Sequence, residues 1–328
     1  MIITRTPFRI SFVGGGSDLE SFYSLHAGAV LSTSINKYMY ISSHKYFEED
    51  KIRVKYSQTE TVHKASELQH PIFKTALQQF NIEGGIEISS IADVPSGTGM
   101  GSSSSFTVGV LHNLYTWNRQ FASKEMLASE ACDIEINQLK EPIGKQDQYA
   151  AAYGGLNIIR FNTNGSVNVE PLFIKKEIYH SLEDNLVMFY YGNQRSASSI
   201  LSEQKNNNSQ EDKRKNLIEM VSLVDDLKNC LYNENLNDFG KILHQNWLLK
   251  KQLASQISNG EIDDIYNLAM KNGALGGKLL GAGGGGFLLF YCEKEKQINL
   301  IKALHKLHYF PFKFDNEGSK IIYTEYED

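Results

Sequence analysis

A glycine- and serine-rich segment in the first third of the chain has the composition of a phosphate-binding loop. Pro95–Ser105 reads PSGTGMGSSSS and precedes an apolar stretch, Phe106–Trp117, that is expected to be helical. Its glycines let the backbone come close to a ligand, and the N-terminus of a helix directs free N–H groups at an anion. Serine hydroxyls can hydrogen-bond phosphate or bind Mg²⁺. A flexible linker is the alternative, but a linker would need no apolar helix directly after it.

Two further glycine-rich segments lie near the two ends of the chain. Thr6–Asp18 reads TPFRISFVGGGSD, and Lys278–Gly286 reads KLLGAGGGG. Taken alone, the first is also compatible with a tight turn capped by Asp18, and the second with a hairpin or bulge. Four consecutive glycines lose much chain entropy on folding, so close packing against a ligand or another backbone is the better interpretation.

The familiar nucleotide-binding motifs do not fit these segments. After Gly14 and Gly16, Leu19 occupies the position where a dinucleotide fingerprint needs its third glycine. No GxxxxGK[ST] loop occurs, because the stretch from Gly273 to Lys278 is one residue short and continues into Leu279. Rossmann dehydrogenases and P-loop NTPases are therefore weak alternatives.

The remaining pattern predicts an α+β protein of two domains. Arg9–Val13 and Ile35–Ser42 are rich in β-branched and aromatic residues, as strands are. A helix is expected from Ser123, a plausible N-cap, to Leu139, and a short one over Lys145–Ala152. From about residue 196 to 270 the chain is mostly helical and polar, so we place the domain boundary near residue 180, giving domains 1–180 and 181–328.

Composition excludes several classes of function. The net charge of −5 and pI near 6 argue against broad nucleic-acid binding, which usually needs a basic surface. Cys132, Cys230 and Cys292 are far apart and odd in number, so we expect reduced thiols in the cytoplasm instead of a disulfide framework. The longest apolar run, around Phe287–Cys292, is too short to span a membrane, and the N-terminus resembles no signal peptide.

The three glycine-rich segments, in this order, resemble the motifs of the GHMP kinase superfamily. Pro95–Ser105 is similar to the family's P-x-G-x-G-L-G-S-S motif, with Met100 in place of leucine. The resemblance covers essentially the whole chain. It implies a two-domain α+β fold with an N-terminal domain like ribosomal protein S5 domain 2 and a ferredoxin-like C-terminal domain. It also implies an ATP- and Mg²⁺-dependent kinase, with nucleotide contacts from Pro95, Gly97, Gly99, Gly101, Ser102, Ser103 and Ser104.

Within this superfamily, three stretches most resemble the bacterial heptose kinases. They are TPFRISFVGGGSD, GKQDQYAAAYGG and GALGGKLLGAGGGGFLLF. This resemblance implies a small sugar phosphate as partner and phosphorylation of the anomeric C1 hydroxyl of D-glycero-D-manno-heptose 7-phosphate. Another GHMP kinase, acting on fucose, galactose or mevalonate, is the first alternative. A non-catalytic sugar-sensing module on the same fold is the second, and an assembly into a homodimer is left open.

The resemblance assigns catalytic and metal-binding roles to four residues. Asp147 matches the base that accepts the hydroxyl proton, although it could also be a helix-terminal aspartate. Arg9 matches the basic residue beside that base, against the alternative of a charge on a strand surface. Glu135 and Ser103 match the Mg²⁺ ligands. Glu135 precedes Asp147 by one residue more than in mevalonate kinase, which leaves Glu130 as a weaker candidate.

The resemblance also assigns a set of contacts to the acceptor. Asp18 matches the position that accepts hydrogen bonds from sugar hydroxyls. Arg195, at an expected helix start, is a candidate for the phosphate of the acceptor, with an exposed arginine as the alternative. The glycines expected near the acceptor are Gly15, Gly16, Gly283 and Gly284. The histidines share no metal-binding spacing and are given no role.

Overall fold

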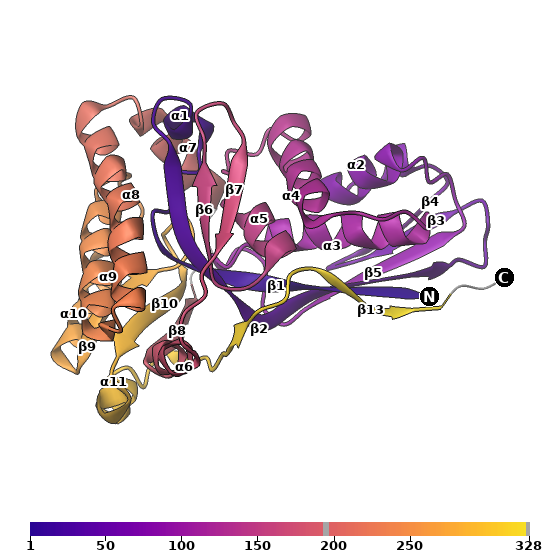
Figure 1. Cartoon of the computed structure of the whole chain (residues 1–328). Coiled ribbons are helices and arrows are strands. Elements are labelled where there is room, and N and C mark those ends of the chain that lie inside the picture. The colour runs from indigo at the N-terminus through magenta and orange to yellow at the C-terminus, as the bar shows by residue number, and fades with distance from the viewer. Residues whose placement is uncertain (193–196, 326–328) are drawn as a thin grey trace.

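The computed structural model describes residues 1–192 and 197–325 and arranges them around two β-sheets (Figure 1). Within the described residues, one sheet has nine strands and the other has four. The larger sheet is formed mainly by the N-terminal part of the chain, and the smaller sheet lies with the long C-terminal helices. This is the mixed α+β organisation that the sequence predicts.

Two long antiparallel strands, β1 (Ile2–Val13) and β2 (Gly28–Lys45), form the centre of the larger sheet. The second half of β2 pairs with β5 (Ile86–Ala92), and its first half pairs with β6 (Asn157–Phe161). Arg9 and Ser11 lie near the C-terminal end of β1, just before the glycine loop Gly14–Gly16. The other strands of this sheet are β3 (Ile52–Lys55), β4 (Thr59–Val62), β7 (Val167–Pro171), β12 (Phe314–Asp315) and β13 (Lys320–Thr324).

Helices of the N-terminal part cover one face of this sheet (Figure 1). The apolar stretch after the serine-rich loop forms α3 (Ser102–Trp117), which packs against both β1 and β2. Ser123 caps α4 (Lys124–Cys132) by accepting a hydrogen bond from the Met126 amide, as its residue type predicts. The helix continues as a π-helical turn, Asp133–Gln138, a local geometry that often occurs at functional sites. The remaining helices of this part are α1 (Glu20–Tyr23), α2 (Pro71–Gln79), α5 (Gln146–Tyr153) and α6 (Lys176–Asp184).

The smaller sheet has the strand order β11-β8-β10-β9 and lies beside a layer of helices (Figure 1). Its central strand β10 (Gly286–Cys292) is buried on both faces, so that alternate side chains enter two different hydrophobic cores. Phe287 and Leu289 join the core shared with the larger sheet, whereas Leu288 and Phe290 join the core of the second part. The other strands of this sheet are β8 (Leu186–Gly192), β9 (Ala274–Leu279) and β11 (His308–Tyr309). The helices of the second part are α7 (Ala197–Asn207), α8 (Glu211–Tyr232), α9 (Leu236–Lys251), α10 (Gly260–Lys271) and α11 (Gln297–Ala303).

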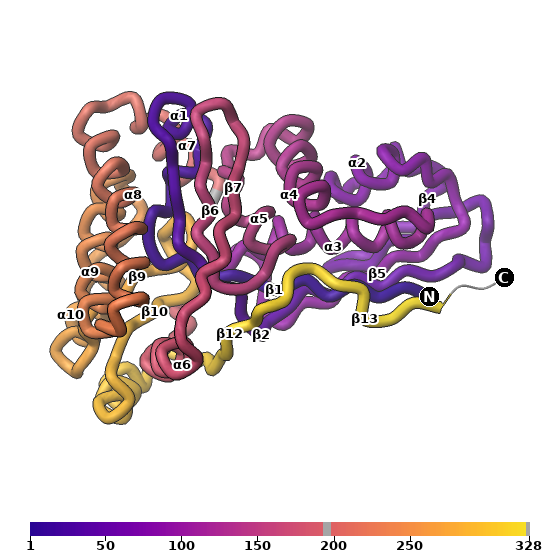
Figure 2. The backbone as a smooth tube through the Cα atoms, in the orientation of Figure 1, coloured from indigo at the N-terminus to yellow at the C-terminus, as the bar shows by residue number. Residues whose placement is uncertain are grey.

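The C-terminal segment leaves the second part and returns to the first sheet. β12 pairs with β2, and β13 pairs with the start of β1, so the two ends of the chain lie side by side (Figure 2). The expected division near residue 180 falls within α6 and stays a prediction. The return of β12 and β13 means that the larger sheet is built from both ends of the sequence.

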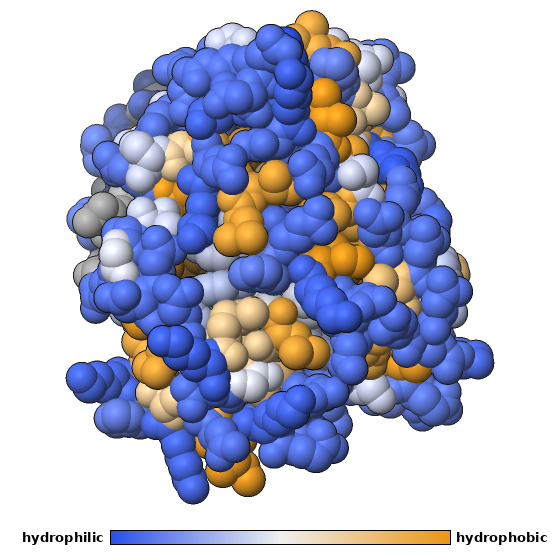
Figure 3. All heavy atoms as spheres, turned by 90° about the vertical axis from the view of Figure 1, so that its left-hand side faces the viewer, coloured by the Kyte–Doolittle hydropathy of each residue, from blue (hydrophilic) through white to orange (hydrophobic). Residues whose placement is uncertain are grey.

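The outer surface of the second part is mostly hydrophilic. The end of the molecule that carries α8, α9 and α10 shows apolar side chains in separate patches (Figure 3). Ile218, Leu248 and Leu268 are each a little over 40% exposed, which is ordinary for single apolar side chains on a protein surface. Among the described residues, none of the helices combines the length and hydropathy that crossing a membrane requires. Assembly into a homodimer stays a prediction.

Candidate active site

Arg9 and Asp147 form an ion pair where β1 passes the start of α5. The Nε atom of Arg9 donates to Asp147 Oδ1 at 2.8 Å, and Nη2 donates to Oδ2 at 2.8 Å. The Arg9 side chain is 4% exposed and that of Asp147 is 24% exposed. A two-pronged contact between the planar guanidinium and the carboxylate fixes the direction in which the carboxylate points. Arg9 is therefore a buried partner of Asp147 and not a charge on a strand surface.

The glycine-rich loops Pro95–Ser105 and Lys278–Gly286 meet beside this ion pair. A side-chain carbon on Gly99 would lie 2.4 Å from the carbonyl oxygen of Leu280, so the two backbones touch directly. Arg9 Nη1 also donates to the Gly99 carbonyl at 2.6 Å, which ties the loop to the ion pair. Gly101 has φ of +73°, and a side-chain carbon there would lie 3.2 Å from Asp147 Oδ2. Glycine is needed at this position for its backbone conformation and for the space it leaves to Asp147.

Glu135 is buried behind the serine-rich loop. It is 1% exposed and lies on the π-helical turn. Ser103 donates to its Oε1 at 2.8 Å, and Ser104 and Gln148 donate to Oε2 at 2.8 and 2.7 Å. Burial raises the pKa of Glu135, and the three hydrogen bonds partly offset that rise. Glu135 and Ser103, both expected as Mg²⁺ ligands, are thus in contact, and their binding of Mg²⁺ stays a prediction.

Glu130 faces a different part of the domain. Tyr115 and Gln79 donate to its two carboxylate oxygens at 2.5 and 3.3 Å. Ser103 donates to Glu135 and not to Glu130. The contacts therefore favour Glu135 as the partner of the serine-rich loop.

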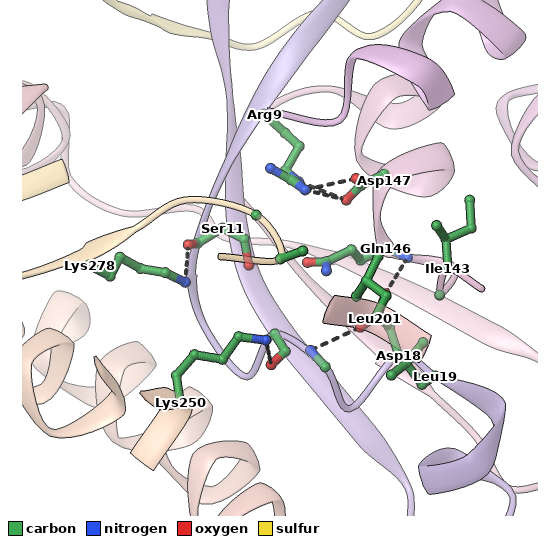
Figure 4. Close-up of a pocket in the computed structure, with 15 residues that line it drawn as sticks. Arg9, Ser11, Asp18, Leu19, Ile143, Gln146, Asp147, Leu201, Lys250 and Lys278 are labelled. Atoms are coloured by element: carbon green, nitrogen blue, oxygen red, sulfur yellow. Dashed lines mark hydrogen bonds and ion pairs between the residues drawn. The ribbon is translucent and has the colours of Figure 1, made fainter. Parts of the chain in front are cut away.

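Asp18 lies in a small cavity that the ion pair of Arg9 and Asp147 also lines (Figure 4). It is 4% exposed, and its two oxygens accept hydrogen bonds from the amides of Gly16 at 3.0 Å and Gln146 at 3.3 Å. Burial raises the pKa of Asp18, and the nearby charge of Asp147 raises it further. The cavity is lined by Arg9, Ser11, Gly15, Gly16, Asp18, Leu19, Ile143, Gly144, Gln146, Asp147, Leu201, Lys250, Lys278, Gly281 and Ala282.

Two lysines that the sequence analysis missed enter the same cavity from the second part of the molecule (Figure 4). Lys250, on α9, donates to Gln204 Oε1 at 3.1 Å and to the Gly15 carbonyl at 3.4 Å. Lys278, on β9, donates to the carbonyls of Ser11 at 2.7 Å and Phe12 at 3.1 Å. Burial lowers the pKa of Lys250 to about 8 and lowers that of Lys278 as well. Lys278 thereby joins the third glycine-rich segment to β1.

A second and larger cavity, of about 670 Å³, lies on the other side of the serine-rich loop. The loop contributes Pro95, Gly97, Ser102 and Ser103 to its wall. Apart from three polar side chains, the rest of the wall is apolar and aromatic, a composition that suits a flat heterocycle. Its members there include Met39, Tyr56, His70, Ile72, Val94 and Phe106.

Comparison with known proteins decides the family. The family of GHMP kinases N terminal domains matches residues 66–155, and that of GHMP kinases C terminal domains matches residues 224–309. The D-glycero-alpha-D-manno-heptose 7-phosphate kinase of Campylobacter jejuni is 33% identical over 97% of this chain and 98% of its own length. The chain belongs to the GHMP kinases. It is therefore a phosphotransferase that uses ATP and an alcohol acceptor.

Solved structures agree with this GHMP kinase fold. A putative sugar kinase from C. jejuni is 31% identical, covers 98% of this chain and 97% of its own, and superposes with a TM-score of 0.78. A D-glycero-D-manno-heptose 1-phosphate kinase from Bacteroides thetaiotaomicron is 24% identical and covers all of both chains with a TM-score of 0.82. The latter supports the fold alone. The two-domain GHMP kinase fold predicted from the sequence is confirmed, as is the enzyme class.

The first turn of α5 brings the parts of the candidate site together. Gln146 faces the cavity of Asp18, Asp147 faces Arg9, and Gln148 faces Glu135. Three consecutive helical positions point in three directions because each residue advances the helix by 100°. A single short helix therefore positions groups between the two cavities.

The remaining expected contacts differ in position. Gly15 and Gly16 line the smaller cavity, and their expected contact with the acceptor stays a prediction. Gly284 donates its amide to the Ile257 carbonyl at 3.1 Å, and Gly283 packs against the backbone of Ile257. Their contact with the acceptor stays a prediction. Arg195 lies outside the described residues, and its role also stays a prediction.

Proposed function

We propose that this GHMP kinase transfers the γ-phosphoryl group of ATP to the anomeric C1 hydroxyl of D-glycero-D-manno-heptose 7-phosphate. The identity of 33% over nearly the full length of the heptose 7-phosphate kinase of C. jejuni supports this acceptor. The observation that carries the proposal is the position of Asp147. A side-chain carbon at Gly101 of the serine-rich loop would lie 3.2 Å from Asp147 Oδ2, and Asp147 also lines the cavity that holds Asp18.

The proposed reaction uses Asp147 as the base. The acceptor hydroxyl loses its proton to the Asp147 carboxylate while its oxygen bonds to the γ-phosphorus, and the bond to the β-phosphate oxygen breaks. Arg9 holds the carboxylate in place through its two hydrogen bonds. Asp18 accepts hydrogen bonds from other hydroxyls of the sugar, so that the reacting hydroxyl faces Asp147. Phosphoryl transfer depends mainly on such positioning and on charge stabilisation.

ATP is proposed to bind across the serine-rich loop. Its phosphates would contact the N-terminus of α3, where free amides and serine hydroxyls gather. Its base would enter the larger cavity, against the apolar and aromatic wall that includes Tyr56 and Phe106. This arrangement directs the γ-phosphate toward Gly101 and Asp147.

The residues around Ser103 fit a Mg²⁺ ion. Mg²⁺ in kinases is bound by one or two carboxylates together with phosphates and waters, and it stabilises the charge on the phosphates. Glu135 is a buried carboxylate that forms no ion pair within the described part of the chain. Three hydrogen bonds stabilise this carboxylate but no opposite charge among the described residues pairs with it, and a cation beside Glu135 and Ser103 would offset the remaining cost of burying its charge. We therefore propose Ser103 and Glu135 as Mg²⁺ ligands, with Ser104 and Gln148 orienting the carboxylate.

We also infer a cytoplasmic location, where ATP and sugar phosphates are available. The three cysteines are free thiols, which is typical of reducing compartments. Fractionation of cells followed by detection of the protein would test this inference.

The acceptor can be tested with a panel of alcohols. Purified enzyme would be given ATP, Mg²⁺ and one of heptose 7-phosphate, heptose 1-phosphate, free heptose, galactose or mevalonate, and kcat/KM would be measured by ADP release. We expect heptose 7-phosphate to give the highest value, and ³¹P NMR of the product to show a new phosphate coupled to the anomeric proton. A higher kcat/KM with heptose 1-phosphate, or with any unphosphorylated acceptor, would refute the assignment.

A further inference from the structure

Lys250 places a buried ammonium group in the smaller cavity, where the acceptor is proposed to bind. The residue is 5% exposed, and its charge comes from a helix of the second part of the molecule (Figure 4). Gly15 and Gln204 accept two of its hydrogen bonds. A lysine ammonium has three N–H donors, so one is left for another group. Among the described residues, no carboxylate oxygen lies within ion-pair distance of this ammonium.

Two other polar atoms in the wall of this cavity are buried without a hydrogen-bond partner. They are the hydroxyl oxygen of Ser11 and the amide oxygen Oε1 of Gln146. A buried polar atom without a partner destabilises the protein, because it has given up its hydrogen bonds to water. Such atoms therefore call for an explanation, and a bound ligand is a common one. Their position beside Lys250 and Asp18 indicates that the ligand would lie between the two parts of the molecule.

The chemistry of the wall distinguishes hydroxyl groups from phosphate. Lys250 and Ser11 can donate hydrogen bonds, whereas Gln146 Oε1 and the Asp18 carboxylate accept them. A hydroxyl group both donates and accepts, so a ring with several hydroxyls can satisfy all four residues. A phosphate group only accepts, so it would leave Gln146 Oε1 and the Asp18 carboxylate without a donor. Two of the three cations described in the wall are already engaged, Arg9 by Asp147 and Lys278 by two backbone carbonyls. The mixed wall therefore matches the polyhydroxyl body of a sugar.

We propose that Lys250, together with Ser11 and Gln146, recognises the ring hydroxyls of the acceptor, and that the phosphate of the acceptor lies outside this cavity. Lys250 donates to the oxygen of a hydroxyl whose proton is accepted by Asp18. This inference rests on the proposed function and deepens it, because it names the part of the acceptor that the second domain recognises. Burial lowers the pKa of Lys250 and the charge of Asp18 raises it, so Asp18 stabilises the charged form of this donor.

The test uses Lys250→Met, which keeps an unbranched side chain and removes the donors. Lys251→Met is the matched control, because Lys251 is the next residue of α9 and pairs with Asp263 at 2.9 Å outside the cavity. A hydrogen bond from a charged group contributes about 1.5–3 kcal/mol, which corresponds to roughly 10–150-fold in kcat/KM. We expect Lys250→Met to lower kcat/KM for the acceptor by that factor. The KM for ATP should stay within about twofold, and Lys251→Met should resemble the wild type.

A panel of deoxy sugars separates recognition from a structural role. Each analogue lacks one ring hydroxyl, and the loss in kcat/KM is compared between the wild type and Lys250→Met. We expect one analogue to be poor for the wild type but to show little further penalty in the variant, because both changes remove the same hydrogen bond. Equal additional penalties for all analogues would overturn the inference in favour of a structural role. Selective loss of the preference for phosphorylated over free sugar would overturn it in favour of phosphate binding.

Two further arrangements keep this test decisive. If thermal melting shows that Lys250→Met is unfolded, the same panel is measured with Ser11→Ala, which removes only a hydroxyl from the cavity. If galactose proves to be the best acceptor, the proposed heptose assignment fails, and the deoxy panel is built on galactose with the same expected result. Mevalonate as the best acceptor would overturn the inference itself, since its carboxylate and few hydroxyls do not match this wall.

Discussion

The guanidinium of Arg9 holds the carboxylate of Asp147 with two hydrogen bonds of 2.8 Å while also bonding the Gly99 carbonyl at 2.6 Å. One side chain therefore links the proposed base to the serine-rich loop. Arg9 therefore couples the position of the proposed base to that of the serine-rich loop. Phosphoryl transfer requires such a fixed arrangement, because it depends mainly on how the reacting groups are positioned.

Replacing Asp147 by asparagine should remove most of the turnover. Asparagine keeps the size of the side chain but cannot accept the hydroxyl proton, and general-base contributions are about 10²–10⁴-fold. ATP affinity, measured by calorimetry or fluorescence, should stay within about threefold because the proposed nucleotide contacts do not include Asp147. A variant with more than half of the wild-type kcat would show that Asp147 only caps its helix.

Replacing Arg9 by lysine should also be severe, although the charge is kept. A lysine ammonium cannot form the two-pronged contact with Asp147 and the bond to Gly99 at the same time. We expect kcat to fall by about 10–100-fold, consistent with the effect of small misplacements of catalytic groups. Steady-state kinetics of Arg9→Lys beside Arg5→Lys, a substitution at another β1 arginine that pairs with Glu317, would test this expectation. Similar kcat values for the two variants would contradict it.

The sequence predicted the pairs that short motifs encode. Arg9 with Asp147 and Ser103 with Glu135 could be named because family motifs carry them, and the structure places both pairs within hydrogen-bond distance. Lys250 could not be predicted in this way. It follows Trp247–Leu249 near the end of an amphipathic helix, where two lysines usually mark a solvated helix terminus. Lys250 has a role only because α9 packs against the glycine loop Gly14–Gly16.

Other features depend on contacts far apart in the sequence. The pairing of β13 with β1 joins residues about 320 positions apart, and no local pattern signals it. The aromatic wall of the larger cavity combines Tyr56, His70 and Phe106 from a strand end, a helix cap and a helix. Each residue by itself resembles ordinary core. The site residues that could be predicted from the sequence were thus those that lie in contiguous motifs.

Removal of the proposed Mg²⁺ ligands should change the metal requirement. Glu135→Gln keeps the shape of the side chain and removes its charge, and Ser103→Ala removes a hydroxyl ligand. We expect each variant to need about tenfold more Mg²⁺ for half-maximal activity at fixed ATP, in line with losses of metal affinity for altered ligand shells. Glu130→Gln serves as the control, because Glu130 bonds Tyr115 and Gln79 instead. A shift for Glu130→Gln alone would move the ligand role to that residue.

Burial of His112 predicts that stability falls in mild acid. Burial lowers the pKa of His112 from 6.5 to about 4, and its Nδ1 atom hydrogen-bonds the Ser319 hydroxyl at 3.0 Å. Between pH 6.5 and 4 the unfolded chain binds a proton at this histidine that the folded protein does not, so stability is lost as the pH falls. From pH 7.5 to 5 this effect amounts to roughly 1–2 kcal/mol. Urea unfolding of wild type and His112→Gln at both pH values should show a smaller loss for the variant.

Gly101 offers a test of how closely the loop is fitted to Asp147. An alanine there has to adopt φ of +73°, and its side-chain carbon would lie 3.2 Å from Asp147 Oδ2, so the carboxylate has to move by a few tenths of an ångström. Gly97 is the matched control. It has the same φ of +73°, but a side-chain carbon there meets no atom within 4 Å. Both alanine variants therefore carry the same backbone strain, about 1–2 kcal/mol, and only one displaces the proposed base.

We expect kcat of Gly101→Ala to fall by about 10–100-fold, because displacement of a reacting group by an ångström can cost about 10²-fold. The kcat of Gly97→Ala should stay within about threefold of the wild type, although its KM for ATP can rise because Gly97 lines the larger cavity. Thermal melting of the two variants provides the check on shared strain, with similar shifts expected. Equal kcat values in the two variants would show that Asp147 tolerates the displacement, and the close fit between Gly101 and the proposed base would then have no part in catalysis.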